Sequence, residues 1–213
     1  EKRNGENNSI CFLVPGTTIS GGIAVIFKYA NALLERGYDV RILSLSNNNN
    51  GTWFPNQKVE IVPYSKIRKM LSDGDIDVLV ATGYSTAFTV ALAKVRRKLY
   101  FVQSDESRFF PHDRQLTERI KKTYELPLEC IVAVSWLREW LKKEYKKDAY
   151  LVPNGLDLNI FHRTDPVEEK SSKIRVLIEG GINIPYKGMD DAYVAINDLD
   201  CELWIVSNNG DPK

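Results

Sequence analysis

The stretch that decides the fold is residues 10–45, which read ICFLVPGTTISGGIAVIFKYANALLERGYDVRILSL. It opens with a short apolar run without helical spacing, followed by a loop that contains three glycines. Residues 23–34 are apolar except for polar side chains that fall on one side, such as Lys28 and Asn31. A second apolar run, residues 40–43, follows. We therefore predict a strand, a loop, a helix and a second strand, which together make a βαβ unit.

The loop of this unit places Gly21 and Gly22 directly before the helix. Glycine lets a ligand approach the backbone closely, and the first N–H groups of a helix have no partner inside it. Such a turn can hold an anion, for example a phosphate group. A Gly-Gly pair is as typical of a tight turn that binds nothing, so both interpretations stay open at this point.

The spacing around the glycines excludes two kinds of nucleotide site. Gly16 and Gly21 are spaced as in a P-loop, but Gly22 and Ile23 stand where that loop has the Lys and the Ser or Thr that bind phosphate and magnesium. An NAD site needs G-x-G-x-x-G and an acidic residue after the second strand, whereas that strand runs into Ser44, Leu45, Ser46 and four asparagines. Neither an NTPase nor an NAD enzyme is expected.

Composition excludes further classes. A net charge of +1 over 213 residues argues against a general nucleic-acid binder, which needs a basic face. No run of eighteen uncharged apolar residues is present to cross a membrane. Cys11, Cys130 and Cys201 each lie beside an apolar run, so we interpret them as small buried residues of a reducing cytoplasm. The two histidines are too few for a zinc cluster.

The strand and helix pattern continues along the chain. We predict strands at residues 59–62, 78–81, 99–102, 130–133 and 149–152, and helices at residues 67–71, 85–96, 115–124 and 135–145. The segment Trp53 to Pro55 is not expected to form a strand. A charged loop, residues 103–110, follows the strand at 99–102, at the strand end where α/β enzymes place substrates. A loop that is merely solvated is the alternative.

Two other features have a functional and a plainer interpretation. Asp73, Asp75 and Asp77 form D-x-D triplets, whose carboxylates can bind a metal, but they precede a strand, away from the end that binds ligands. We predict no metal site. The helix at 135–145 has an apolar face opposite a basic one, which suits either an anionic membrane surface or packing on a sheet with the basic face in water.

The pattern restarts after a polar stretch. We expect a flexible N-terminus at residues 1–9, a Rossmann-like domain with a parallel sheet at 10–162, a linker at 163–172 and the truncated beginning of a second Rossmann-like domain at 173–213. In the last part we predict a strand at 174–178, a helix at 189–196 and a strand at 203–206. About forty residues are too few to bury a core of their own.

Four motifs occur in a familiar order. They are Gly21-Gly22 with the helix end 34–40, Val132-Ala133-Val134-Ser135, residues 152–157 with Phe161, and Tyr186-Lys187-Gly188-Met189. In these motifs the chain resembles the family 4 glycosyltransferases of the GT-B fold. The segment 100–110 is also similar to bacterial rhamnosyltransferases that build surface polysaccharides.

The resemblance implies a retaining, metal-independent transferase without a cofactor. Such an enzyme moves a sugar from a nucleotide-sugar donor to a glycan or a lipid-linked acceptor. Carried over, Gly21, Gly22 and Lys187 would bind the donor diphosphate. The acceptor would contact the segment after the strand at 99–102, namely Gln103, Ser104, Asp105 and Arg108.

The catalytic residue is left open, with Asp105 and Glu106 as candidates. Two departures from the family pattern stand out. Gly181 occupies the place of an Arg that many members carry six residues before the Lys, and the segment from Gln103 to Glu106 replaces a first-domain histidine. The family's paired glutamates would lie beyond Lys213, so we do not expect the chain alone to turn over.

Two alternatives to the transferase remain. One is a sugar-nucleotide epimerase of the same architecture, and the other is a two-lobed sugar- or anion-binding protein without catalysis. We expect a cytoplasmic protein that binds no nucleic acid, with peripheral contact at the inner membrane face as an open option.

Overall fold

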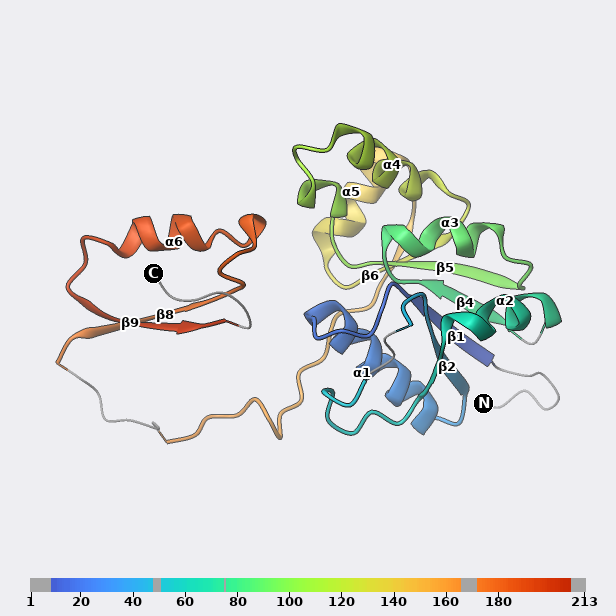
Figure 1. Cartoon of the computed structure of the whole chain (residues 1–213), viewed down its shortest axis with the longest axis horizontal. Coiled ribbons are helices and arrows are strands. Elements are labelled where there is room, and N and C mark those ends of the chain that lie inside the picture. Colours follow the sequence, from blue (N-terminus) through green and yellow to red (C-terminus); the bar gives the residue numbers. More distant parts are fainter. Residues whose placement is uncertain (1–8, 48–50, 75, 166–171, 208–213) are drawn as a thin grey trace. The chain divides into compact units, whose positions relative to one another are not determined.

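The computed structural model describes residues 9–47, 51–74, 76–165 and 172–207, drawn in colour in Figure 1. The chain divides into two compact units, Glu1–Gly155 and Leu156–Lys213. The first unit therefore ends before residue 162, where the sequence predicted the end of the first domain. Most of the predicted flexible N-terminus (1–9) and of the predicted linker (163–172) lies outside the described residues.

Unit 1 is built on a seven-stranded sheet of parallel strands in the order β3-β2-β1-β4-β5-β6-β7 (Figure 1). Its strands are β1 (Ser9–Val14), β2 (Asp39–Ser44), β3 (Glu60–Val62), β4 (Val78–Ala81), β5 (Arg97–Val102), β6 (Glu129–Val132) and β7 (Ala149–Leu151). Its helices are α1 (Gly21–Glu35), α2 (Tyr64–Asp73), α3 (Tyr84–Leu92), α4 (Arg114–Glu125), α5 (Ser135–Tyr145) and the short 3-10 helix η1 (Glu106–Phe109). The prediction of a Rossmann-like α/β unit with a parallel sheet is confirmed.

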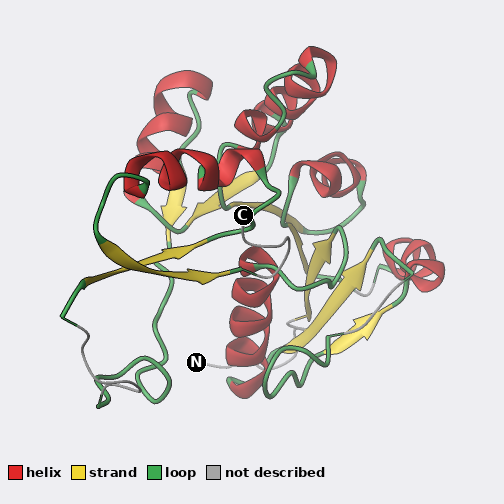
Figure 2. Ribbon diagram, turned by 60° about the vertical axis from the view of Figure 1, so that its left-hand side comes forward, coloured by secondary structure: helices red, strands yellow, loops and turns green. Residues whose placement is uncertain are grey.

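Helices cover both faces of this sheet (Figure 2). Successive side chains of a strand point to opposite faces. Cys11 and Leu13 of β1 accordingly pack with α2 to α5, whereas Phe12 and Val14 pack with α1. Burial on both faces explains why the strand reads as a continuous apolar run instead of an alternating one.

On its face of the sheet, α1 packs with the segment 51–57. Its buried residue Phe27 packs against the rings of Trp53 (centroid distance 5.6 Å) and Phe54 (5.3 Å), which also contact each other (5.8 Å). The indole Nε1 of Trp53 donates to the carbonyl oxygen of Thr17 over 2.7 Å. Trp53 to Pro55 lie in turns and a bend and form no strand, as predicted, and the bond from Trp53 to Thr17 holds the loop that leads into α1.

Some helices and strands begin or end at other residues than the sequence predicted. The helix predicted at 85–96 ends at Leu92, because Ala93 is already extended (φ −65°, ψ 146°). The strand predicted to begin at 99 begins at Arg97, whose guanidinium pairs with Glu129 at 2.5 Å on the neighbouring strand. The helices predicted at 135–145 and 189–196 have the predicted bounds.

Unit 2 is a single βαβ element. Strands β8 (Ile174–Glu179) and β9 (Cys201–Val206) pair in parallel, and between them lie the 3-10 helix η2 (Pro185–Lys187) and helix α6 (Met189–Ile196). The second strand starts two residues before the predicted 203–206. The prediction that the pattern restarts in this part of the chain is confirmed.

The three cysteines are free, and those of unit 1 serve as small packing residues. Cys11 and Cys130 are buried, as predicted, whereas Cys201 is only half-buried. Burial raises the pKa of the Cys11 thiol to about 12, so this thiol stays protonated and unreactive at neutral pH.

Candidate functional site

The strand order creates one place in unit 1 where two adjacent loops diverge. Neighbouring strands β1 and β4 are followed by α1 and α3, which lie on opposite faces of the sheet. In open α/β sheets, ligands bind outside the carboxyl ends of the strands at such a topological switch point. Strand β5 lies beside β4 and contributes the next loop. The residues that meet here form what we call the switch-point site, namely Gly21, Gly22, Thr82, Gly83, Gln103 and Glu106.

The N-terminus of α1 forms one side of the switch-point site. Ser20 is the N-cap, and its Oγ accepts from the backbone N–H of Ile23 over 3.2 Å. Among the described residues, nothing accepts a hydrogen bond from the backbone N–H of Gly21 or Gly22. A Cβ built on Gly21 would meet no atom within 4 Å. This helix end therefore has the open N–H groups that an anion site needs, which was one of the two interpretations of the glycine pair.

Gln103 connects the α1 side of the site to the β4 side. A Cβ built on Gly22 would lie 3.3 Å from Oε1 of Gln103 and 3.4 Å from its Nε2, so glycine is what lets this amide approach. The same Nε2 donates to the carbonyl oxygen of Thr82 over 3.4 Å. The structure thus brings together Gly22, predicted on the donor side, and Gln103, predicted on the acceptor side.

Asp105 has a structural role that the sequence did not predict. The segment expected to be a loop contains η1, and the buried Asp105 is its N-cap. Its Oδ1 accepts from the backbone N–H and hydroxyl of Ser107, and its Oδ2 accepts from Nε of Arg108 over 3.0 Å. Both oxygens therefore have partners within the turn. Ser104 is half-buried beside it, and the side chain of Arg108 is 72% exposed.

Glu106 is the candidate carboxylate that reaches the site. Its Oε2 accepts from the backbone N–H of Tyr84 at 2.8 Å and from the hydroxyl of Tyr100 at 3.0 Å. Its own N–H donates to the hydroxyl of Tyr124 over 3.0 Å. Its Oε1 accepts no hydrogen bond from the described residues, and it would lie 3.3 Å from a Cβ built on Gly83. Of the two predicted catalytic candidates, the geometry favours Glu106.

Burial raises the pKa of Glu106 above its ordinary value, while the hydrogen bonds from Tyr100 and Tyr84 act in the opposite direction. No cationic side chain among the described residues forms an ion pair with it. A carboxyl group whose pKa moves toward neutrality can exchange a proton with a substrate hydroxyl, which an ordinary surface carboxylate does poorly.

This raised pKa has a measurable consequence for stability. As pH rises from the ordinary pKa to the raised one, the folded chain keeps a proton that the unfolded chain has lost. Relative to Glu106→Gln, the wild type should therefore be most stable at acid pH and lose stability as pH rises through that window. Urea unfolding of both proteins over a pH series measures the difference.

Glu129→Gln is the matched control for this prediction. The hydrogen bond from Arg97 lowers the pKa of Glu129. The wild type should therefore gain stability relative to Glu129→Gln as pH rises from the lowered pKa to the ordinary one. If the stability of the wild type relative to both variants changed in the same direction as pH rises, the assignment of a raised pKa to Glu106 would be contradicted.

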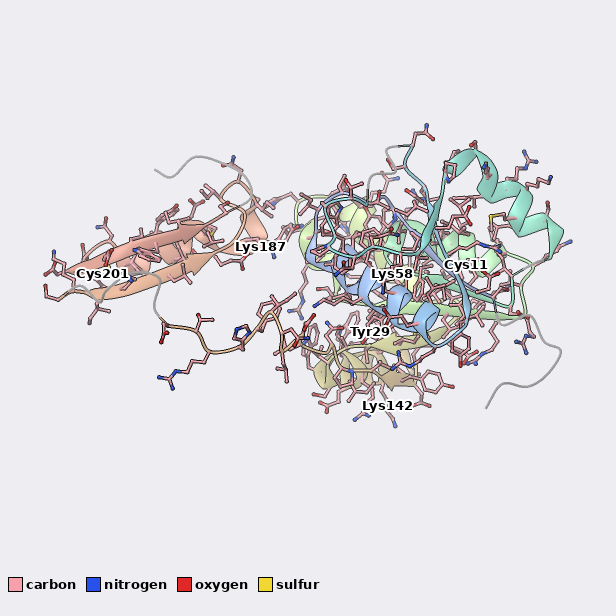
Figure 3. All side chains as sticks on the ribbon, turned by 90° about the horizontal axis from the view of Figure 1, so that it is seen from below. Cys11, Tyr29, Lys58, Lys142, Lys187 and Cys201 are labelled. Carbon is pink, nitrogen blue, oxygen red and sulfur yellow. The ribbon has the colours of Figure 1, made fainter. Side chains whose placement is uncertain are left out.

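Lys187, the third residue predicted at the donor diphosphate, lies in unit 2 (Figure 3). It is exposed at the end of η2, beyond the carboxyl end of β8, and it forms no ion pair with a described residue. Gly188 follows with φ 68°, a left-handed turn into α6 that favours glycine. Gly181, which replaces the Arg of the family pattern, is buried.

The D-x-D segment shows a structural use for its last aspartate. Asp77 precedes β4, and its Oδ2 accepts from the backbone N–H of Ser9 over 3.1 Å and from its hydroxyl over 3.2 Å. Asp77 also pairs with Arg96 at 3.4 Å. The side chains of Asp73 and Asp75 lie outside the described part of the chain. Within that part, no group of three or more His, Cys, Asp or Glu side chains is placed to hold a metal ion.

The basic helix predicted at 135–145 is α5, and its apolar face is used inside unit 1. Leu137 and Leu141 are fully buried, and Trp140 and Tyr145 pack against Tyr124 of α4. Most of this apolar face is therefore packed inside unit 1, whereas Trp136 in its first turn is 47% exposed. Among the described residues, no helix has both the length and the apolar character needed to cross a membrane.

Sequence reasoning missed the residues that hold Glu106. Tyr84, Tyr100 and Tyr124 come from α3, β5 and α4, and no spacing in the sequence connects them. It also missed Thr86, whose Oγ1 accepts from the backbone N–H groups of Thr82 (3.0 Å) and Gly83 (3.2 Å). The Thr82-Gly83 pair, which lies between a predicted strand and a predicted helix, was the one sequence signal that could have pointed to this part of the site.

A scan against protein-family models finds no match to the chain, and a search of curated proteins finds none either.

Proposed function

We propose that this chain is part of a retaining glycosyltransferase of the GT-B type, which moves a sugar from a nucleotide-sugar donor to a glycan or lipid-linked acceptor without a metal ion. The observation that carries the proposal is the open N-terminus of α1 at the topological switch point, with the amide of Gln103 against Gly22. An anion-binding helix end next to polar side chains suits a substrate with a phosphate group and a hydroxyl-rich part.

The N–H groups of Gly21 and Gly22 would act on the leaving nucleoside diphosphate. When the bond between the sugar and the phosphate breaks, negative charge grows on the diphosphate. Backbone dipoles that are already oriented toward this charge stabilise it without reorganising. For Lys187 of unit 2, the resemblance implies an ammonium group that binds a donor diphosphate, in the role that a metal ion has in other transferases.

The segment after β5 would hold the acceptor. Gln103 keeps hydrogen-bonding capacity beyond its bond to Thr82, and the exposed guanidinium of Arg108 keeps further N–H donors beside the one used by Asp105. Ser104 lies between them in sequence. Glu106 would accept a hydrogen bond from the reacting part of the acceptor through Oε1, whereas Asp105 would act indirectly by shaping η1 and holding Arg108.

Lys187→Ala is expected to weaken the binding of a nucleotide sugar by about tenfold, because it removes a charge that would contact the diphosphate. Isothermal titration with UDP-, GDP- and dTDP-sugars measures the change, and the loss should shrink as salt is added. Lys173→Ala is the control, since Lys173 pairs with Asp200 at the opposite end of β8. Equal affinities for Lys187→Ala and wild type would remove Lys187 from the site.

A further inference from the structure

Two helix N-termini meet the switch-point site, and they differ in what occupies them. At α1, the N–H groups of Gly21 and Gly22 have no acceptor among the described residues. At α3, the carboxylate of Glu106 accepts from the N–H of Tyr84 at 2.8 Å, and Thr86 takes the N–H groups before it. The chain therefore supplies its own anion at α3 and leaves α1 open.

Glu106 is held in one orientation from three elements. The N–H of Tyr84 at the start of α3 and the hydroxyl of Tyr100 on β5 both bind its Oε2, and the hydroxyl of Tyr124 on α4 binds its backbone N–H. The rings of Tyr100 and Tyr124 stack with an interplanar angle of 7°. Tyr100 and Tyr124 are buried, so this support is rigid. Its other oxygen, Oε1, lies against Gly83.

The charge balance at this point is negative. The neighbouring carboxylate of Asp105 is matched by Arg108 at 3.0 Å, but Glu106 has no cationic partner among the described residues. An ionised carboxylate is an acceptor only, so Oε1 favours a group that donates, such as a hydroxyl. A phosphate or carboxylate at the same place would meet a like charge in a partly dehydrated setting, where repulsion is strong.

We infer that Glu106 is a specificity-determining residue that selects an uncharged, hydroxyl-bearing sugar as the acceptor and excludes acceptors with a phosphate or carboxylate at that position. This inference rests on the proposed function, because it assigns the acceptor side of the same site. The two helix ends then divide the substrates by charge, with the diphosphate at α1 and the neutral sugar at Glu106.

The test uses the whole chain, labelled with nitrogen-15, at a mildly alkaline pH. The neutral probes are the methyl glycosides of glucose, mannose, galactose and rhamnose, and the charged probe is methyl glucuronide. In the wild type, at least one neutral glycoside should shift the amide resonances of Gly83 and Tyr84, and the glucuronide should not. In Glu106→Gln, the affinity for the glucuronide should rise at least about tenfold. Glu129→Gln is the control, because Glu129 begins β6 and pairs with Arg97, and it should leave the discrimination unchanged.

Three results would overturn the inference. They are equal binding of methyl glucuronide and the neutral glycosides by the wild type, continued rejection of the glucuronide by Glu106→Gln, and the absence of any shift at Gly83 and Tyr84 with all four neutral glycosides. The comparison of methyl glucuronide with the neutral glycosides on the wild type tests the inference even if Glu106→Gln does not fold. Donor binding is measured separately, at the amide resonances of Gly21 and Gly22. A negative result with the glycosides would overturn the role of Glu106 but not the proposed sugar transfer. A negative result with the donors would overturn the proposed donor site but not the glycoside result.

Discussion

Replacing Phe27 by alanine is expected to lower the free energy of unfolding of unit 1 by about 4 kcal/mol. The side chain is fully buried, and it packs against the rings of both Trp53 and Phe54 on the face that α1 covers. Its loss opens a cavity and removes two aromatic contacts, each of which adds to the cost of the lost burial. Urea unfolding followed by tryptophan fluorescence measures the effect, because Trp53 is at the cavity.

Leu92→Ala is the control for this prediction. Leu92 ends α3 and is 84% exposed, so its replacement should change stability by less than about 0.5 kcal/mol. A comparable loss in the two variants would mean that Phe27 does not anchor α1. The anchoring matters for function, because the same helix carries Gly21 and Gly22 at its N-terminus.

The second large effect concerns binding. Gly22→Leu is expected to lower the affinity for a nucleotide sugar by at least about tenfold without unfolding the chain. A Cβ at this position would already lie 3.3 Å from Oε1 of Gln103, so a branched side chain must displace this amide and fill the space beside the free N–H groups. Leucine is a good helix former, so α1 itself should persist.

Calorimetric titration of Gly22→Leu with the nucleotide sugar that the wild type binds checks this expectation. Gly155→Leu is the matched control, because a Cβ built on Gly155 meets nothing within 4 Å. Its circular dichroism spectrum and affinity should match those of the wild type. If Gly22→Leu binds as tightly as Gly155→Leu, the N-terminus of α1 is not the anion site.

Most of the fold was predictable from the sequence because the signals were local. Each buried strand is a short apolar run, and each helix between strands carries its own pattern of apolar and polar residues. The helix that begins at Gly21 was predictable from the glycine pair and the apolar run after it. Helix α3 was predicted too long, because the turn that ends it depends on the extended backbone of Ala93, which no Gly or Pro marks.

The candidate site was predictable only in part. Gly21, Gly22 and segment 103–108 were identified because glycines before a helix and polar residues after a strand are recognisable signals. Their contact depends on the strand order, which places β4 between β1 and β5. The different roles of Asp105 and Glu106 also needed the structure, because two adjacent carboxylates look alike in a sequence. One caps η1, and the other reaches across to the start of α3.

The most direct test of the central claim is a titration of the nitrogen-15 labelled chain with UDP-, GDP- and dTDP-sugars, observed at the backbone amides of Gly21 and Gly22 and the side-chain amide of Gln103. We predict that at least one of the three donors shifts these resonances and that the shift saturates, because the free N–H groups of α1 bind the diphosphate. If all three donors leave the amide resonances of Gly21 and Gly22 unchanged, the switch-point site does not bind a nucleotide sugar, and the chain is not part of a glycosyltransferase that holds its donor there.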